Sequence, residues 1–414
     1  MAEKEGKKQR VIMGLHGNAL VISLTDFVID CGMFLTNVFW SLYVLELGAS
    51  IADLGLFSLI TGILPALLVA PIGYLGDRVS RKKLIIVGNF ISSMGTLMNA
   101  FATSWVGLIP GTLLESLSPI IRPVRQSLIA EDIVPSERGK AFSTVFTLMM
   151  LPDTFMPPIA GVILDLVGLN LGMRYMLIIS AALRFLVAFL RLKFLTEGKR
   201  TPRAKSEFSL SAASVRGTLV DMFRPLVSIK ALQVMVVGSA SSAFAMGMMM
   251  RYQSVFVVNV VGLTMTEWGV ISAGVSLIRV LTRIPLGGLT DRWGRRKSIL
   301  INYCLQPICI VAFAFSRDFL TIFLSMAARI IAFNFGGGAW EAMIVDVTPS
   351  EVRGSVYGSI GAVEMAARSI SPFFGSVVWD SFSPEWVFHL TAIFRTFSAG
   401  VLYKFLKDPE IREE

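Results

Sequence analysis

The sequence has little charge for its length. Of its 414 residues, 16% are Asp, Glu, Lys or Arg, whereas soluble domains carry about 25%. Hydrophobic residues make up 54%, and the mean hydropathy is +0.67. Apolar runs of about 20 residues, enough to cross the hydrocarbon core of a bilayer, recur along the whole chain. These features exclude an ordinary soluble fold and predict an all-α membrane protein.

Cysteine is scarce as well, with three residues in the chain. Cys31, Cys304 and Cys309 all lie inside apolar runs, so no disulfide framework is indicated. The sequence also lacks the phosphate-binding pattern Gly-x-x-x-x-Gly-Lys-Ser/Thr, which argues against transport driven by its own hydrolysis of ATP. No metal site and no cofactor are predicted.

The basic residues do not indicate a nucleic-acid partner, although the formal net charge is +9. They lie in short loops between the apolar runs, which is the topogenic pattern of membrane proteins. The loops on the opposite side carry mainly acidic residues, among them Glu46, Asp53 and Glu267. By the positive-inside rule, both termini are predicted to be cytoplasmic in a multi-pass protein of the plasma (cell) membrane.

The two halves of the chain repeat one another. The segment Gly73–Lys83 recurs as Gly287–Lys297, an interval of 214 residues (287 − 73). At the same interval Gly48 matches Gly262, and many further positions keep this register. An internal duplication of this length is typical of transporters built from two related helical bundles.

Twelve apolar spans, six in each repeat, follow from the apolar runs. They cover roughly residues 18–45, 51–76, 83–102, 105–130, 140–166, 171–195, 229–259, 266–289, 298–316, 318–345, 354–379 and 384–406. These spans predict an N-terminal six-helix bundle over residues 1–195 and a C-terminal six-helix bundle over residues 229–414. Residues 196–228, which are rich in Ser, Lys and Arg, are predicted to form a cytoplasmic linker between them.

The repeated basic loops resemble those of the major facilitator superfamily. The likeness is carried by the pattern Gly-x-Leu-x-Asp-Arg-x-x-Arg-Lys/Arg-Lys, which begins at Gly73 and again at Gly287. The Pro-Ser-Glu loops at residues 135–139 and 349–354 add to it. The resemblance spans nearly the whole chain. It implies two six-helix bundles around a central cavity and alternating access by rocking of one bundle against the other.

A further likeness points to the proton antiporters of that family that export drugs and metabolites. The fifth predicted helix is similar to their Gly-Pro-x-x-Gly-Gly element, with Pro157 and Val162 in place of two glycines. The fourth predicted helix departs from the family, because Glu115 stands in the region where many members have an arginine. The tenth keeps the family's arginine as Arg329. The first likeness favours export, and the departure speaks against proton handling through a helix-4 arginine.

The basic loops also have a physical role that can be derived from their residues. Gly73 and Gly287 let two helices approach closely, and Asp77 and Asp291 can each face the positive N-terminus of a helix in the other bundle. Neighbouring basic residues can pair with these aspartates or with Asp132. The resemblance implies a cytoplasmic latch that stabilises the outward-open state, although the same charges could serve only to fix orientation. The latch candidates are Gly73, Asp77, Arg78, Arg81, Lys82, Asp132, Gly287, Asp291, Arg292 and Arg295.

Charges inside the membrane are costly and are therefore candidates for function. Asp26 and Asp30 lie one turn apart on the first predicted helix and share a face. Both cannot be ionised cheaply in a low-dielectric wall, so one of them is expected to carry a proton. Together with Glu115 and Asp153, they are the proton-coupling candidates.

The second half carries arginines at similar depth. The predicted cavity therefore has an acidic wall from the first half and a basic wall from the second, which could hold an anionic group. Arg184 and Arg395, on the sixth and twelfth predicted helices, are expected to form structural pairs. The substrate-binding candidates are Arg251, Arg279, Arg329, Glu364 and Arg368.

The favoured interpretation is a secondary active transporter, monomeric, that moves a small organic molecule by alternating access and exports it in exchange for protons. Its partners would be the substrate, protons and the lipid bilayer. The main alternative is uptake or facilitated diffusion of an anionic metabolite, with the carboxylates merely pairing the arginines. An integral membrane enzyme resembling a prenyltransferase could use Asp26 and Asp30 as Mg²⁺ ligands, but such sites need further clustered carboxylates. The chain is therefore not expected to be an enzyme.

Overall fold

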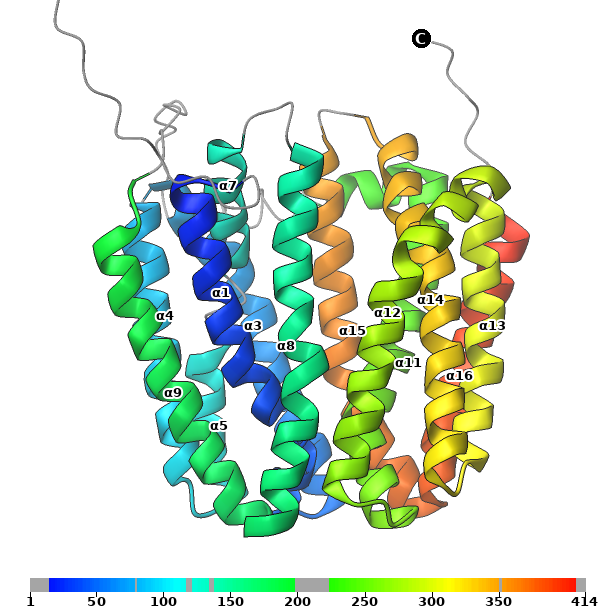
Figure 1. Cartoon of the computed structure of the whole chain (residues 1–414). Coiled ribbons are helices and arrows are strands. Elements are labelled where there is room, and N and C mark those ends of the chain that lie inside the picture. The colour runs from blue at the N-terminus through cyan, green and yellow to red at the C-terminus, as the bar shows by residue number, and fades with distance from the viewer. Residues whose placement is uncertain are drawn as a thin grey trace, which may run out of the picture. The chain divides into compact units, whose positions relative to one another are not determined.

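A computed structural model describes residues 15–78, 80–116, 121–133, 138–197, 223–349 and 352–406. The described part of the chain is a series of long helices (Figure 1). Those of the first half are α1 (Gly17–Asn37), α2 (Trp40–Glu46), α3 (Ile51–Arg78), α4 (Arg81–Phe101), α5 (Trp105–Glu115), α7 (Arg122–Asp132), α8 (Arg138–Val167) and α9 (Leu169–Phe194). Those of the second half are α11 (Lys230–Val255), the π-helix η2 (Phe256–Val260), α12 (Met265–Trp293), α13 (Arg295–Phe315), α14 (Phe319–Val347), α15 (Arg353–Ser381) and α16 (Pro384–Phe405).

The length and composition of the helices identify an all-α membrane protein, as predicted. Within the described residues, eight helices are long and apolar enough to cross a bilayer. Large apolar side chains stand on their outer surfaces, and Ile284 and Leu166 are 85% and 80% exposed. Such surfaces belong in lipid rather than in water.

The predicted spans differ from the helices mainly where a helix is interrupted. The first predicted span contains α1 and the short α2, which are separated at residues 38–39. The fourth predicted span is divided between α5 and α7. Apolar residues continue through the first break, so hydropathy alone cannot detect it, whereas the second begins at Ser116 and is followed by the more polar α7.

The chain divides into two compact units, residues 1–48 with 67–202 and residues 49–66 with 203–414. The first part of α3 therefore groups with the second unit, whereas the sequence division had placed all of residues 1–195 together. Small residues explain the close packing of α3 on α15, since a Cβ added at Gly55 or Gly62 would collide with Ser376 or Ser369. Much of the predicted linker, residues 198–222, lies outside the described residues.

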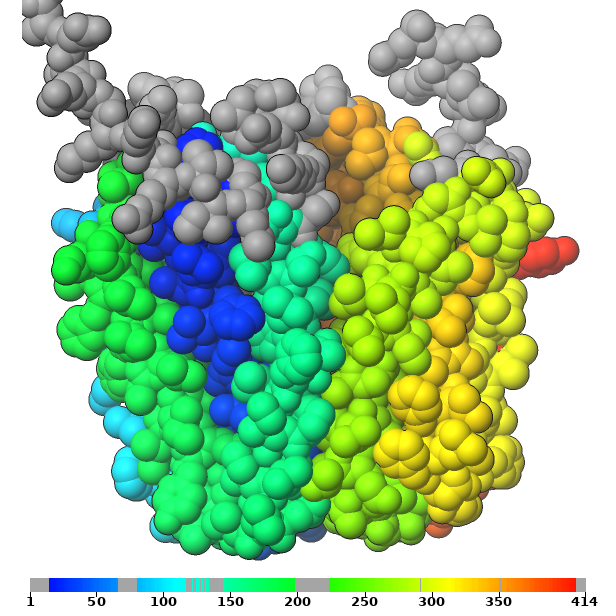
Figure 2. All heavy atoms as spheres, in the orientation of Figure 1, coloured from blue at the N-terminus to red at the C-terminus, as the bar shows by residue number. Residues whose placement is uncertain are grey.

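The duplication is visible in the packing of each unit. In the first unit α9 packs against α1 and α4, α1 packs against α8, and α4 packs against α5. The second unit repeats this scheme, with α16 against α11 and α13, α11 against α15, and α13 against α14. On the face shown in Figure 2, α1 lies between α8 and α9.

The repeat also extends to the residues just before α3 and α12, which begin in the same way. Gly48 and Gly262 both have a φ of +87°, a backbone conformation that glycine adopts without strain. Two residues later, Ser50 and Thr264 begin α3 and α12 in equivalent ways. Ser50 exchanges hydrogen bonds with Asp53, and Thr264 forms a capping box with Glu267. The acidic residues of these loops thus stabilise helix starts.

Candidate functional site

A buried ion cluster in the first unit has Asp26 of α1 at its centre. Oδ1 of Asp26 accepts hydrogen bonds from Nη1 of Arg125 on α7, at 2.6 Å, and from Nη2 of Arg191 on α9, at 2.5 Å. Arg191 also donates from Nε to Oγ1 of Thr25, at 2.9 Å. Asp26 is 7% exposed and Arg191 is completely buried. Charge-assisted hydrogen bonds from two guanidinium groups therefore fix the position of this carboxylate.

A second group of charges in the first unit surrounds Arg184 on α9. Nη1 of Arg184 donates to Oγ of Ser92 on α4, at 3.0 Å. The charges that act on this guanidinium most strongly are the carboxylates of Glu115 and Asp30, followed by the like charge of Arg125. Both carboxylates are half-buried.

These two groups correct the prediction of an acidic wall in the first half. Arginines of α7 and α9 lie among these carboxylates, so the interior of this unit carries both signs of charge. The expectation that Asp26 or Asp30 carries a proton stays a prediction. The residues concerned are Asp26, Asp30, Glu115, Arg125, Arg184 and Arg191.

The fourth proton-coupling candidate, Asp153, lies on α8 and is 9% exposed. It follows Pro152, in a helix that also contains Pro157 and Pro158. Proline cannot donate a backbone hydrogen bond, so this stretch of α8 has fewer helical hydrogen bonds than its neighbours. The role assigned to Asp153 stays a prediction.

Arg125 and Arg191 are the functional residues that sequence reasoning missed. Arg191 stands in the last turn of α9, beside Lys193, where a basic residue is normally explained by orientation and by the helix dipole. Arg125 follows closely after a proline near the end of an apolar run. The only signal was that both belong to spans rather than to loops, in a unit with several buried carboxylates to neutralise.

The second unit has a contrasting group of charges, made by Arg279 of α12, Arg329 of α14 and Arg395 of α16. The charges that act on Arg329 are chiefly those of Arg279 and Arg395, with the thiol of Cys309 as a smaller influence. Nε of Arg329 is buried and has no hydrogen-bond partner among the described residues. Among the described residues of this unit, the ion pairs Arg295–Asp346 and Arg317–Glu385 lie at helix ends.

Arg395 is held by neutral groups. Its Nη1 donates to Oγ of Ser242, and its Nη2 donates to Oδ1 of Asn302 at 3.4 Å. The guanidinium carbon lies 4.6 Å from the ring centre of Tyr303, a cation–π contact. Arg395 is 4% exposed, whereas Arg279 and Arg329 are half-buried. Arg395 is therefore held by an aromatic ring, a hydroxyl group and an amide group, rather than by an acidic residue.

The other predicted substrate-binding residues lie elsewhere in the second unit. Arg251 on α11 is half-buried and precedes Tyr252, whose hydroxyl donates to the carbonyl oxygen of Pro372 at 2.6 Å. Arg368 is among the charges that act on Glu364, as their spacing of one turn on α15 predicts. Arg279 and Arg329 are thus the candidates that the structure brings together.

The latch candidates lie at helix ends. Arg81 forms an ion pair with Glu131 rather than with the predicted Asp132. Asp132 instead accepts the backbone N–H of Asn18 at 2.5 Å, at the N-terminus of α1, where a carboxylate is favourable. Arg295 pairs with Asp346, so both repeats join the arginine of their basic loop to an acidic residue.

The other latch candidates among the described residues give little support for a latch. Arg292 is exposed in the last turn of α12, and Lys82 is half-buried in the first turn of α4. Gly287 has open space around it, so the predicted close helix approach is not seen at this position. The side chains outside the described residues belong to Gly73, Asp77, Arg78 and Asp291.

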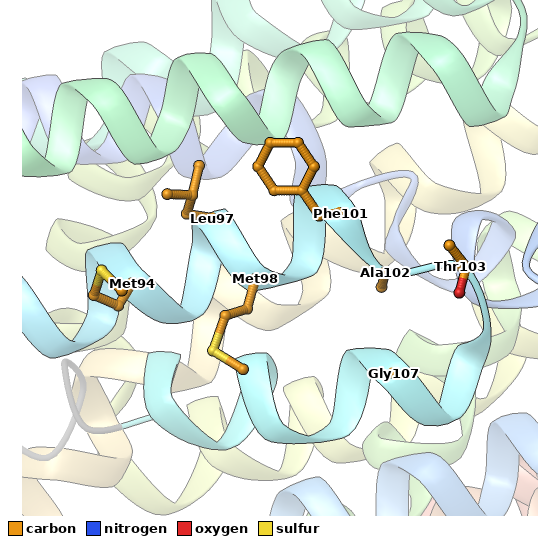
Figure 3. Close-up of a pocket in the computed structure, with 7 residues that line it drawn as sticks. All are labelled: Met94, Leu97, Met98, Phe101, Ala102, Thr103 and Gly107. Atoms are coloured by element: carbon orange, nitrogen blue, oxygen red, sulfur yellow. The ribbon is translucent and has the colours of Figure 1, made fainter.

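Two surface pockets lie apart from these clusters. One, of about 460 Å³, lies along α4 and the start of α5 and is lined mostly by apolar side chains such as Met94, Leu97 and Phe101 (Figure 3). The other, of about 720 Å³, lies between α13 and α16 and is lined by Ile308 and Phe397 among others. Their exposed apolar linings suit contact with lipid tails rather than binding of a polar substrate.

The long paired helices and the repeated basic loops can now be compared with known proteins. A profile of the Major Facilitator Superfamily matches residues 22–340 and, in a second match, residues 235–414. The chain belongs to the Major Facilitator Superfamily. It is therefore a member of a family of membrane transporters, which is not a family of enzymes.

Relatives within the superfamily match nearly the whole chain. An uncharacterized MFS-type transporter of Methanocaldococcus jannaschii is 22% identical over 95% of this chain and 95% of its own length. The multidrug resistance protein MdtG of Proteus mirabilis is 24% identical over 91% of this chain and 92% of its own. A multi-drug resistance efflux pump PmrA homolog of Lactococcus lactis is 25% identical, over 87% and 88%.

Solved transporter structures share the fold. A bacterial homologue of the human lysosomal transporter Spinster, inward-facing and unoccupied, has a TM-score of 0.75 at 16% identity, over 96% of this chain and 98% of its own. The nucleoside transporter NupG has a TM-score of 0.73 at 16% identity, over 94% and 99%. Identities this low describe the architecture and leave the substrate open.

Proposed function

We propose that this superfamily transporter is proton-coupled and exports a small organic molecule across the plasma membrane by alternating access. The observation that supports this most is the set of charges around Asp26 and Arg184 in the first unit. The carboxylates of Asp26, Asp30 and Glu115 lie among the guanidinium groups of Arg125, Arg184 and Arg191, so adding or removing one proton changes the net charge of a low-dielectric interior. Such a change is costly unless the surrounding helices rearrange, which is how a proton can drive a conformational step.

Within this proposal the carboxylates have different roles. Asp26 stays paired with Arg125 and Arg191 and fixes the position of both. Asp30 and Glu115 accept and release the proton, because they are half-buried and act on the guanidinium of Arg184. Asp153 is retained as a further proton carrier on α8.

Export is supported by two observations, the partial antiporter element in α8 and the names of relatives described as multidrug resistance proteins and efflux pumps. The proposal also includes a monomer with both termini in the cytoplasm, as the basic loops indicate. The latch is part of it as well. The equivalent arginines at the starts of α4 and α13, Arg81 and Arg295, each pair with an acidic residue of their own unit.

Two other functions are less well supported. Uptake or facilitated diffusion of an anionic metabolite would use the arginines of the second unit. It would give no role to the buried charges of the first unit. A prenyltransferase-like enzyme would need Asp26 as a metal ligand. That carboxylate already accepts hydrogen bonds from two arginines through one oxygen.

The proposal is tested by reconstituting the purified protein in liposomes and measuring the transport of fluorescent dyes that are cationic, neutral or anionic. An imposed pH gradient should drive accumulation of at least one dye, and a protonophore should abolish it. Asp30→Asn combined with Glu115→Gln should remove the dependence on the gradient, while Arg317→Gln at a surface ion pair should keep it. Accumulation that is the same with and without the gradient would favour facilitated diffusion instead.

A further inference from the structure

One buried face of α4 is polar along most of its length. Its residues recur about once per turn and are each at most 5% exposed: Asn89, Ser92, Ser93, Thr96 and Asn99. The helices that pack on α4 are chiefly α9 and α5. Polar groups on a membrane-spanning helix are costly unless they find hydrogen-bond partners. The partners of this row therefore need to be accounted for.

The hydroxyl groups of the row bond to their own helix, but its amide groups do not. Ser93 donates to the carbonyl oxygen of Asn89 at 2.6 Å, and Thr96 donates to that of Ser92 at 3.1 Å. By contrast, Nδ2 of Asn89 and both Nδ2 and Oδ1 of Asn99 are buried and have no hydrogen-bond partner among the described residues. Such groups in proteins are normally satisfied by ordered water.

The contact between α4 and α5 places Asn99 one turn from Glu115. A Cβ added at Gly95 would lie 2.9 Å from the backbone nitrogen of Glu115, and a Cβ added at Gly111 would collide with Oδ1 of Asn99. These two contacts are four residues apart on both helices, which is about one turn. Oγ1 of Thr112 lies between the two levels and is also buried without a partner in the described part of the chain.

Arg184 reaches the same polar row from α9. Its Nη1 donates to Oγ of Ser92 at 3.0 Å, and its Nε is buried with no partner in the described ranges. Ser92 lies about one turn from Gly95, so Arg184 and Glu115 contact neighbouring turns of α4. The polar row therefore begins at the charges to which the proposed function assigns proton handling.

The other end of the row reaches the surface. Asn99 stands in the last turn of α4, and Thr103 and Ser104, just beyond this helix, are exposed. In the proposed orientation this end faces the outside of the cell. The completely buried Tyr43 also contacts this end, because its hydroxyl donates to the carbonyl oxygen of Asn99 at 3.5 Å.

We infer that Asn99 and Thr112 bind water between α4 and α5, and that this water carries protons between the outer surface and the carboxylate of Glu115. An amide and a hydroxyl group each offer a donor and an acceptor, as a bound water requires. They orient the water and are not themselves protonated. A proton that enters at the outer end passes from water to water, and one proton is delivered to Glu115. This route rests on the proposed proton coupling and specifies how protons reach the first unit.

The bound water is tested by X-ray radiolysis of the purified full-length protein in detergent, because hydroxyl radicals formed from that water oxidise the nearest side chains. Tyr43 and Tyr252 are both completely buried, and Tyr252 lies in the second unit with its hydroxyl bonded to Pro372. Mass spectrometry should find Tyr43 oxidised and Tyr252 unmodified, and Asn99→Leu should protect Tyr43. Equal oxidation or equal protection of the two tyrosines in the unaltered protein would overturn the inference.

The proton route is tested in liposomes with a trapped pH indicator and an imposed dye gradient. Asn99→Leu, which leaves no group to hold water, should slow proton movement about tenfold or more, and Thr112→Val should slow it as well. Asn99→Ser keeps a polar group and room for water and should retain proton movement. Asn259→Leu makes the same change at an exposed residue of η2 and should have no effect. Proton movement at the unaltered rate in folded Asn99→Leu and Thr112→Val variants would overturn the route.

The outcome is separable from that of the proposed function, because radiolysis in detergent needs no transport. Oxidised Tyr43 in a protein that moves no protons would keep the bound water and remove both the coupling and the route. Coupled transport with a protected Tyr43 would keep the proposed function and remove the bound water.

Discussion

At the scale of single residues, the sequence suggested an acidic wall in the first half, whereas the structure shows Asp26 hydrogen-bonded to two arginines. Asp26 was identifiable from the sequence as a buried charge, but its partners were not, because Arg125 and Arg191 resemble residues that only set orientation. Arg279 and Arg329 were among the substrate-binding candidates of the sequence, and that role stays a prediction. The contacts of Arg395 could be found only from coordinates, since they come from α11 and α13.

The Asp26 cluster leads to a prediction about stability. Asp26→Leu leaves two buried arginines without their carboxylate, and it should lower the free energy of unfolding by about 3–5 kcal/mol. The double variant Asp26→Leu with Arg191→Met should recover part of this loss, because it removes one of the uncompensated charges. Unfolding in detergent followed by circular dichroism would measure both variants.

The matched control is Arg317→Met, which breaks an exposed ion pair with Glu385 and should change stability by about 0–1 kcal/mol. A single Asp26 variant as stable as the unaltered protein would show that the cluster does not hold α1, α7 and α9 together.

At the scale of helices, the close crossing of α11 and α15 depends on small residues. A Cβ added at Gly247 of α11 would meet Oγ of Ser371 and the backbone of Arg368 on α15. Gly361, also on α15, has nothing within 4 Å of that position. The same substitution should therefore have opposite effects at the two sites.

Gly247→Ala should lower the free energy of unfolding by about 1–3 kcal/mol, because the helices must move apart. Gly361→Ala should raise it by about 0.5–1 kcal/mol, because alanine restricts the unfolded chain and favours helix. Thermal unfolding of the two variants side by side checks the prediction. Two variants with the same sign of change would mean that the packing of α11 on α15 is looser than described.

Helix positions were largely predictable from the sequence, whereas helix interruptions were not. Apolar runs located α4, α9 and α13 to within a few residues. The division of one run into α5 and α7 and the π-helix at the end of α11 were not predicted. The first had a signal in the sequence, because α7 is much more polar than α5. The grouping of residues 49–66 with the second unit was also missed, because it depends on glycines that face serines of α15.

At the scale of the whole molecule, one helical unit has been used twice with different charges. The helix pairs, the positive-φ glycines and the capped helix starts recur, which accounts for the regular interval in the sequence. The interiors differ, since the first unit holds Asp26 between two arginines, whereas Arg395 of the second is held by neutral groups. The proposed function places proton handling in the first unit.

The central claim, that substrate movement is coupled to protons through the first unit, is tested most directly by measuring the protons themselves. Liposomes containing the protein and a trapped pH indicator would be given a gradient of a transported dye, with no initial pH difference. The account predicts that dye movement changes the internal pH, and that Asp30→Asn combined with Glu115→Gln abolishes this change. Dye movement through the unaltered protein with constant internal pH would contradict it.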